Sequence, residues 1–302
     1  MSSPIEYDHG GPLTFGGAVP EPKGFDASRV VILPVPVDRT TSYVPGTRNG
    51  PREILQASTH MELWDEEVGV DVHGVGLCTL PEMDLPFGEL AEVVDEIRRV
   101  ASEILAHDKF LVALGGEHSI TPPLVAAAAG KFAGLHVLQI DAHADLRDSY
   151  MGTPHNHACA IRRSLEYAPV TQVGIRSLST EEARVAGELD TRVFYDWNMR
   201  DDPQWIDRVV ESLGDPVYIT IDVDALDPAI MPATGTPEPG GLSWYEILRL
   251  LRAVFARRNV VACDVVELSP LPGLMAPNFL CAKLVYKMLA YKYGQSVKAA
   301  RT

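Results

Sequence analysis

The chain has 302 residues, of which 46% are hydrophobic and 22% charged, and its formal net charge at pH 7 is −15. This composition is typical of a globular protein with a sizeable core. The acidic excess argues against nucleic acid and against an anionic membrane as partners, because both bind surfaces rich in Lys and Arg.

Targeting signals are also missing from the sequence. The N-terminus lacks the basic start and apolar core of a signal peptide, and no apolar run reaches the about 18 residues that span a bilayer. The four cysteines have no close pair, which argues against a disulfide framework or a zinc knuckle. We therefore expect a cytoplasmic protein.

Residues 1–28 are rich in Gly and Pro and predict an irregular N-terminal arm. Beyond it, short apolar runs of strand length recur, mostly β-branched and bounded by turn residues or charges. These runs cover residues 30–37, 70–77, 110–114, 135–140, 170–175, 192–195, 217–221 and 260–266. Their continuous apolarity is typical of parallel strands that are covered on both faces.

Helical patterns lie between several of these runs. Apolar residues recur at helical spacing over 88–107, and a final helix is predicted over 278–293. Ser243 and Glu246 form a capping-box pattern at the start of a helix that runs to about residue 257. The sequence therefore predicts one three-layer α/β domain, residues 29–302, with a mainly parallel sheet of about eight strands flanked by helices.

Three predicted strands run into clusters of His and Asp. In parallel sheets, ligands bind beyond the carboxyl ends of the strands, so all three clusters are expected at one sheet edge. The clustered residues are His118, Asp141, His143, Asp145, Asp222 and Asp224. Each cluster alone is common in turns and loops, but three together at one edge favour a binding site.

The spacing within the clusters predicts metal binding. In an extended segment, residues i, i+2 and i+4 point the same way, so Asp141, His143 and Asp145 are expected to converge. Converging carboxylates repel each other unless a cation neutralises them. Mixed imidazole and carboxylate ligands suit Mn²⁺, Fe²⁺, Co²⁺ or Zn²⁺. Two His and four Asp exceed the needs of one ion and suit two ions about 3.5–4 Å apart.

The three clusters resemble the manganese signatures of the ureohydrolases, the arginase and agmatinase family. The resemblance continues over residues 45–51, 222–228, 232–241 and 267–270 and covers most of the chain. It implies an arginase-like fold and two Mn²⁺ per subunit. It also implies a homo-oligomer, a trimer or hexamer.

The resemblance assigns roles to individual residues. One manganese would be held by His118, Asp141, Asp145 and Asp222. Asp141 and Asp222 would bridge to a second ion, which His143 and Asp224 also hold.

Further roles follow from the same resemblance. Glu267 would grip the substrate guanidinium, and Asp145 would hold the proton of a metal-bridging hydroxide that attacks the guanidinium carbon. His157 matches the proton-shuttle histidine, although the Gly and Pro usual after it are Ala158 and Ala160 here, and His155 is a rival. Asn156, His155 and Thr236 are expected to contact the substrate.

The resemblance favours agmatine as the substrate, giving putrescine and urea. Agmatine is a dication without a carboxylate, which suits an acidic protein. Arginase, guanidinobutyrase and guanidinopropionase remain alternatives, with Arg48, Arg162 or Arg163 to receive a carboxylate. A catalytically silent metal-binding homologue and a one-zinc deacetylase of related fold are further alternatives, and the full set of ligands argues against both.

Overall fold

The computed structural model describes residues 13–17 and 23–301 of the chain. In this part, eight strands form one sheet in the order β4-β1-β5-β10-β9-β6-β7-β8, and every neighbouring pair is parallel. The strands are β1 (Val30–Val35), β4 (Leu77–Thr79), β5 (Phe110–Gly115), β6 (His136–Ile140), β7 (Val170–Ile175), β8 (Thr191–Tyr195), β9 (Val217–Asp222) and β10 (Val260–Val266). The prediction of a single α/β domain around a parallel sheet is confirmed.

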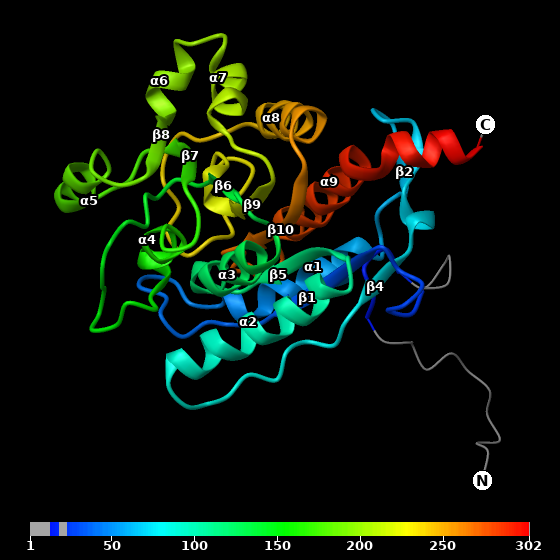
Figure 1. Ribbon diagram of the computed structural model, residues 1–302, viewed down its shortest axis with the longest axis horizontal. Helices are drawn as coiled ribbons and strands as arrows, with labels where there is room; N and C mark the ends of the chain where they lie inside the picture. The colour runs from blue at the N-terminus through cyan, green and yellow to red at the C-terminus, as the bar shows by residue number, and fades with distance from the viewer. Residues whose placement is uncertain (1–12, 18–22, 302) are drawn as a thin grey trace.

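Helices cover both faces of the sheet and make three layers (Figure 1). Side chains alternate across β1: Val30 and Ile32 belong to one core cluster, and Val31 and Leu33 to the other. The first cluster is covered by α1 (Gly50–Ser58), α7 (Trp205–Ser212), α8 (Trp244–Arg257) and α9 (Ala276–Arg301). The second is covered by α2 (Leu90–Ala106), α3 (Thr121–Lys131), α4 (Ala160–Ser164) and α5 (Thr180–Val185), while the short α6 (Asp196–Arg200) contacts β7 and β8.

The strand predicted over 70–77 is wrong as a single element. β3 (Val70–Asp71) pairs antiparallel with β2 (Trp64–Asp65) in a separate hairpin, and only β4 joins the main sheet. Between them lies a 3₁₀-turn, His73–Val75, followed by Gly76 at φ +98°. A glycine in this conformation turns the chain, so the apolar run cannot continue as one strand.

The predicted helices are confirmed with shifted ends. α2 covers most of 88–107, and α9 begins two residues earlier than predicted and continues to Arg301. At the start of α8, Ser243 and Glu246 form the predicted reciprocal cap.

Only part of the predicted arm can be described. Residues 13–17 and 23–28 contain turns but neither helix nor strand, and residues 1–12 and 18–22 lie outside the described residues. Phe15 is buried in the first core cluster, so this part of the arm packs on the domain. The division at residue 28 stays a prediction. All four cysteines are buried thiols, and no helix within 13–17 and 23–301 is long and apolar enough to cross a membrane.

Candidate active site

The site lies at the carboxyl ends of four neighbouring strands in the middle of the sheet, β5, β10, β9 and β6. His118 follows β5, Glu267 directly follows β10, and Asp141 directly follows β6. Asp222 is the last residue of β9, and Asp224 lies in the 3₁₀-turn after it, Val223–Ala225. Because the strands are parallel, their ends bring these side chains to one edge, as the sequence predicts.

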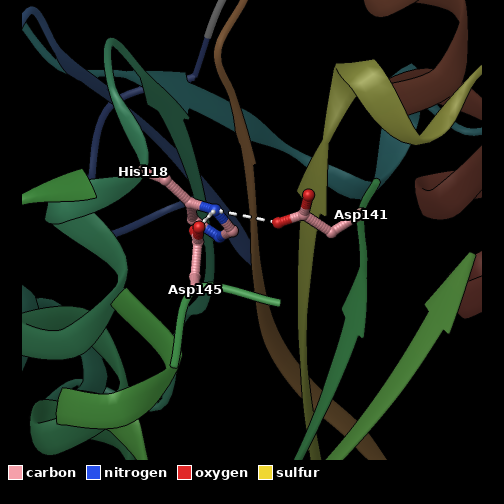
Figure 2. A group of neighbouring side chains, drawn as sticks. All are labelled: His118, Asp141 and Asp145. Atoms are coloured by element: carbon pink, nitrogen blue, oxygen red, sulfur yellow. Dashed lines mark ion pairs between the residues drawn. The ribbon is translucent and has the colours of Figure 1, made fainter. Parts of the chain in front are cut away.

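The first group surrounds the ring of His118. Its Nδ1 atom lies 3.1 Å from Asp141 Oδ2, 3.0 Å from Asp145 Oδ2 and 3.5 Å from Asp222 Oδ2. Figure 2 shows the side chains of His118, Asp141 and Asp145 pointing toward one another. His118 is 1% exposed, and its Nδ1 has no hydrogen-bond partner.

The second group surrounds His143. Its Nδ1 lies 2.9 Å from Asp224 Oδ2 and 3.8 Å from Asp141 Oδ1. In each of two sets, His118–Asp141–Asp145 and Asp141–His143–Asp224, the potential ligand atoms all lie within 4.8 Å of one another. The structure therefore brings the six predicted ligands together in two groups, and Asp141 belongs to both.

The segment from Asp141 to Asp145 does not converge by strand alternation alone, contrary to the expectation. The segment forms only an isolated bridge, at His143, and Asp145 adopts φ +51°. This left-handed turn brings the Asp145 carboxylate to His118, and the Asp145 carbonyl accepts hydrogen bonds from the first turn of α4. Glu267 also has a positive φ, +68°. Such backbone conformations are costly in non-glycine residues and cluster at functional sites.

Close packing also constrains the loop that carries His118. A Cβ atom placed on Gly116 would lie 1.7 Å from the carbonyl oxygen of Val37. Only glycine therefore lets the chain leave β5 at this point and turn into the 3₁₀-helix His118–Ile120.

The charged side chains of the two groups, together with burial, shift one another's pKa values strongly. Burial and repulsion from Asp224 raise the pKa of Asp141 to about 7 and hold that of Asp222 well above its usual range. Burial opposes ionisation of Asp224, but attraction to His143 outweighs it and lowers the pKa to about 2. Burial likewise disfavours charged His143, but Asp224 raises its pKa to about 10.

These residues fit a divalent cation. Among the described residues, the only ion-pair partners of the carboxylates of Asp141, Asp145, Asp222 and Asp224 are His118 and His143. Buried carboxylates without Lys or Arg partners are costly unless a cation neutralises them. The Nδ1 atom of His118, which makes no hydrogen bond, adds a nitrogen ligand facing the same point, and the mixed N/O set suits a borderline divalent metal.

Glu267 and His157 lie beside the two groups. Glu267 Oε1 accepts a hydrogen bond of 2.6 Å from the backbone N–H of His118 and lies 3.9 Å from His157 Nδ1. Burial and repulsion from Glu117 raise the pKa of Glu267 well above its usual value, whereas burial lowers that of His157. The backbone N–H of His157 donates to the Thr40 hydroxyl, so the 38–40 loop positions the histidine.

The contact between His157 and Thr40 depends on Glu117, a residue that the sequence pattern does not mark as functional. Glu117 is fully buried and accepts hydrogen bonds from the backbone N–H groups of Arg39 and Thr40 and from the hydroxyls of Thr40 and Ser119. Its position next to His118 is the only sequence signal that could have drawn attention to it.

A cleft of about 310 Å³ opens over the two groups. It is lined by Ser42, His118, His143, Ala144, Asp145, Arg147, Tyr150, His157, Ala158, Ser177, Leu178, Ser179, Glu182, Asp222, Asp224, Thr236 and Glu267. His157 and Thr236 therefore both line the cleft. His155 and Asn156 are not among the lining residues. Asn156 is buried, and its side-chain oxygen caps the turn His157–Cys159.

Arg147 is a lining residue that sequence reasoning missed. It is the only Lys or Arg among the described residues that line the cleft. Its guanidinium lies over the ring of Tyr150, 4.7 Å from the centroid, and 3.9 Å from Glu182. The arginines that were considered for a carboxylate lie elsewhere: Arg48 pairs with Asp38, and Arg162 and Arg163 pair with Asp148. The position of Arg147, two residues after Asp145, is a sequence signal that could have drawn attention to it.

The fold and the site define an α/β protein with buried His and Asp groups, able to hold metal ions, beneath a cleft. The sequence profile of the "Arginase family" matches residues 28–290. The chain is 41% identical over 275 residues to an N(1)-aminopropylagmatine ureohydrolase of Synechocystis sp., covering 88% of this chain and 90% of that protein. It is 38% identical to an agmatinase of Bacillus cereus, covering 82% and 85%.

A solved structure is similar as well. The agmatine ureohydrolase of Thermoplasma volcanium superposes with a TM-score of 0.87 at 31% identity, covering 96% of this chain and 98% of that one. The chain belongs to the arginase family and is an enzyme of its ureohydrolase branch, so the predicted resemblance is confirmed. The family is metal-dependent, which agrees with the buried His and Asp groups.

Proposed function

We propose that the protein hydrolyses the guanidinium group of agmatine to putrescine and urea and uses two Mn²⁺ ions. The observation that carries this proposal is the pair of ligand groups sharing Asp141, with the buried carboxylate of Glu267 beside them. The first ion would be held by His118, Asp141, Asp145 and Asp222. The second would be held by His143 and Asp224, with Asp141 and Asp222 common to both.

The chain's own residues would bind and orient the substrate. When bound, two divalent cations polarise the substrate and lower the pKa of water, which supplies a nucleophile near neutral pH. Glu267 gives the guanidinium a counter-charge and fixes its orientation. Asp145 accepts a proton at its carboxylate. His157, neutral near pH 7 because burial lowers its pKa, relays a proton toward the leaving amine.

Two other classes of substrate, which differ from agmatine in the tail beyond the guanidinium, also have support. Three relatives, at 41%, 41% and 39% identity, are named N(1)-aminopropylagmatine ureohydrolase, which favours a longer polyamine. Arg147 in the cleft favours a guanidino acid, because a guanidinium readily receives a carboxylate. We favour agmatine over the acids because Arg147 already lies near Glu182 and over the ring of Tyr150.

Urea release tests the proposal. Purified protein would be stripped of metal, reloaded with Mn²⁺, Co²⁺ or Zn²⁺, and supplied with agmatine, N(1)-aminopropylagmatine, arginine or 4-guanidinobutyrate. We expect the highest kcat/KM with Mn²⁺ and agmatine. A preference for another compound overturns the choice of substrate. Bound metal without urea from any compound identifies a silent homologue and overturns the catalytic function.

The assembly and location of the protein are part of the same proposal. We propose a cytoplasmic homo-oligomer, a trimer or hexamer, that acts on a small molecule without nucleic acid or membrane partners. Light scattering of the purified protein measures the oligomer, and a monomer contradicts that part.

A further inference from the structure

A chain of buried hydroxyl groups connects His118 to a carboxylate below the site. His118 Nε2 lies 2.9 Å from Thr220 Oγ1, and Thr220 donates a 2.6 Å hydrogen bond to Asp264 Oδ1. Thr220 and Asp264 are paired residues on β9 and β10, so their side chains share one face of the sheet. Tyr218 and Thr121 donate to Asp264 Oδ2 at 2.6 and 3.1 Å. Thr121, Tyr218, Thr220 and Asp264 are all fully buried.

The positions of the protons follow from the number of donors. A threonine hydroxyl has one proton, and that of Thr220 is used in the short bond to Asp264. The oxygen of Thr220 is therefore left as an acceptor toward His118, so Nε2 of His118 carries the N–H. A metal ion held at Nδ1 requires the neutral imidazole, which carries only one N–H. With that proton on Nε2, the lone pair of Nδ1 faces the three carboxylates around it.

We infer that Thr220 and Asp264 are positioning residues that hold the His118 ring as the Nε2–H tautomer, with Nδ1 presented to a metal ion. This inference rests on the proposed two-metal function and deepens it. It explains why Nδ1, a buried polar atom, has no hydrogen-bond partner. Outer partners of this kind fix the tautomer and orientation of metal-binding histidines in general.

Within the part of the chain that the structure describes, His143, the histidine of the second ligand group, has no such support. His143 Nε2 lies 3.8 Å from Glu238 Oε1, beyond hydrogen-bond range, and the Glu238 side chain is 35% exposed. The ring of His143 is itself 23% exposed, against 1% for His118. The buried chain of hydroxyls thus acts on one of the two groups.

The test is metal affinity, measured without turnover. Thr220→Val removes the hydroxyl and keeps the shape, whereas Thr220→Ser keeps the hydroxyl. The matched control is Thr171→Val, since Thr171 is also a buried strand threonine whose hydroxyl lies 3.0 Å from a histidine Nε2, that of His136, outside the cleft lining. Metal-stripped proteins would be titrated with Mn²⁺ and Co²⁺ by calorimetry, with the visible absorption of bound Co²⁺ as a second readout.

We expect Thr220→Val to bind metal about 10–100-fold more weakly and to change the Co²⁺ spectrum. Thr220→Ser and Thr171→Val should bind like the wild type. Unchanged affinity in Thr220→Val, or equal weakening in Thr220→Ser, overturns the inference alone. A wild-type protein that binds neither metal overturns the proposed function and the inference with it. Thermal unfolding of the metal-free variants checks folding, and Thr220→Ala replaces Thr220→Val if the latter does not fold.

Discussion

The floor of the cleft and its outer wall are built in different ways. The floor, formed by His118, Asp141, Asp222 and Glu267, is buried and lies at the ends of adjoining central strands. The outer wall, formed by Arg147 and Tyr150, lies on the loop between β6 and α4 and is partly exposed. Floor residues are held by strand register, whereas Arg147 is held by a ring contact and a distant carboxylate.

We infer from this difference that the floor and the outer wall have different roles. A site fixed by adjacent strands places charges accurately, as metal binding and guanidinium orientation require. A wall on a loop varies without disturbing the sheet, which is why loops on a fixed scaffold usually determine specificity. We therefore expect floor substitutions to abolish chemistry and wall substitutions to alter substrate choice.

Substitution of Asp141 should have the largest effect. Asp141→Asn removes a charge that belongs to both ligand groups, so metal content should fall and urea release should drop by on the order of 1000-fold or more. Asp148→Asn is the matched control, because Asp148 lies in the same loop but is 73% exposed and pairs with arginines outside the cleft. A fully metallated and active Asp141→Asn protein would contradict the assignment of the floor.

The floor was predictable from sequence for a physical reason. Residues at the ends of parallel strands must meet at one edge, so apolar runs followed by His and Asp were sufficient to locate it. Strand alternation predicted that the carboxylate of Asp145 would reach the site. In the structure, a left-handed turn at Asp145 brings it there. The hydroxyl chain below His118 was not predictable, because Thr220 and Asp264 meet only through the register of β9 with β10.

Other features of the fold could not be predicted from the sequence pattern either. α3 is buried around most of its circumference, so it has no amphipathic stripe from which to predict a helix. Arg147 reaches the cleft through a loop that includes Asp145 and Met151, both at positive φ. Such loop conformations do not follow from apolar periodicity.

Glu267→Gln should have the next largest effect, and it tests whether the floor binds substrate as well as metal. Loss of one partner of a buried charge pair costs roughly 2–5 kcal/mol, so kcat/KM for agmatine should fall about 30-fold or more. Metal content, measured by atomic emission, should stay at the wild-type level. Loss of metal together with activity would instead place Glu267 among the residues that maintain the ligand groups.

His157 lies between the floor and the wall, and its replacement should have an intermediate effect. His157→Gln should lower kcat by about 100-fold through loss of proton transfer. Burial lowers the pKa of His157 below 6.5, so the ring is neutral at pH 7 and gains a proton only as the pH falls below 6.5. Wild-type kcat should therefore decline below pH 6.5. This decline in kcat, the acid limb of the pH profile, should be weaker in His157→Gln.

His155→Gln is the control for the shuttle. His155 is not among the lining residues of the cleft, so its replacement should leave kcat and the pH profile close to those of the wild type. If His155→Gln loses the acid limb and His157→Gln keeps it, the roles of the two histidines are reversed.

Arg147→Gln should have the smallest effect and should change selectivity rather than rate. The guanidinium of Arg147 is partly exposed, with 37% of its side chain accessible, so solvent screening limits its interaction with a substrate charge to about 1 kcal/mol. The kcat/KM for agmatine should rise by about fivefold or less, because one cation facing the distal ammonium is removed. The kcat/KM for 4-guanidinobutyrate should fall by a similar factor. Arg162→Gln, on an arginine that pairs with Asp148 outside the cleft, should change neither value. If Arg147→Gln instead lowers turnover of every substrate alike, Arg147 maintains the shape of the outer wall through its contacts with Tyr150 and Glu182, and the loop is as much a part of the catalytic structure as the floor.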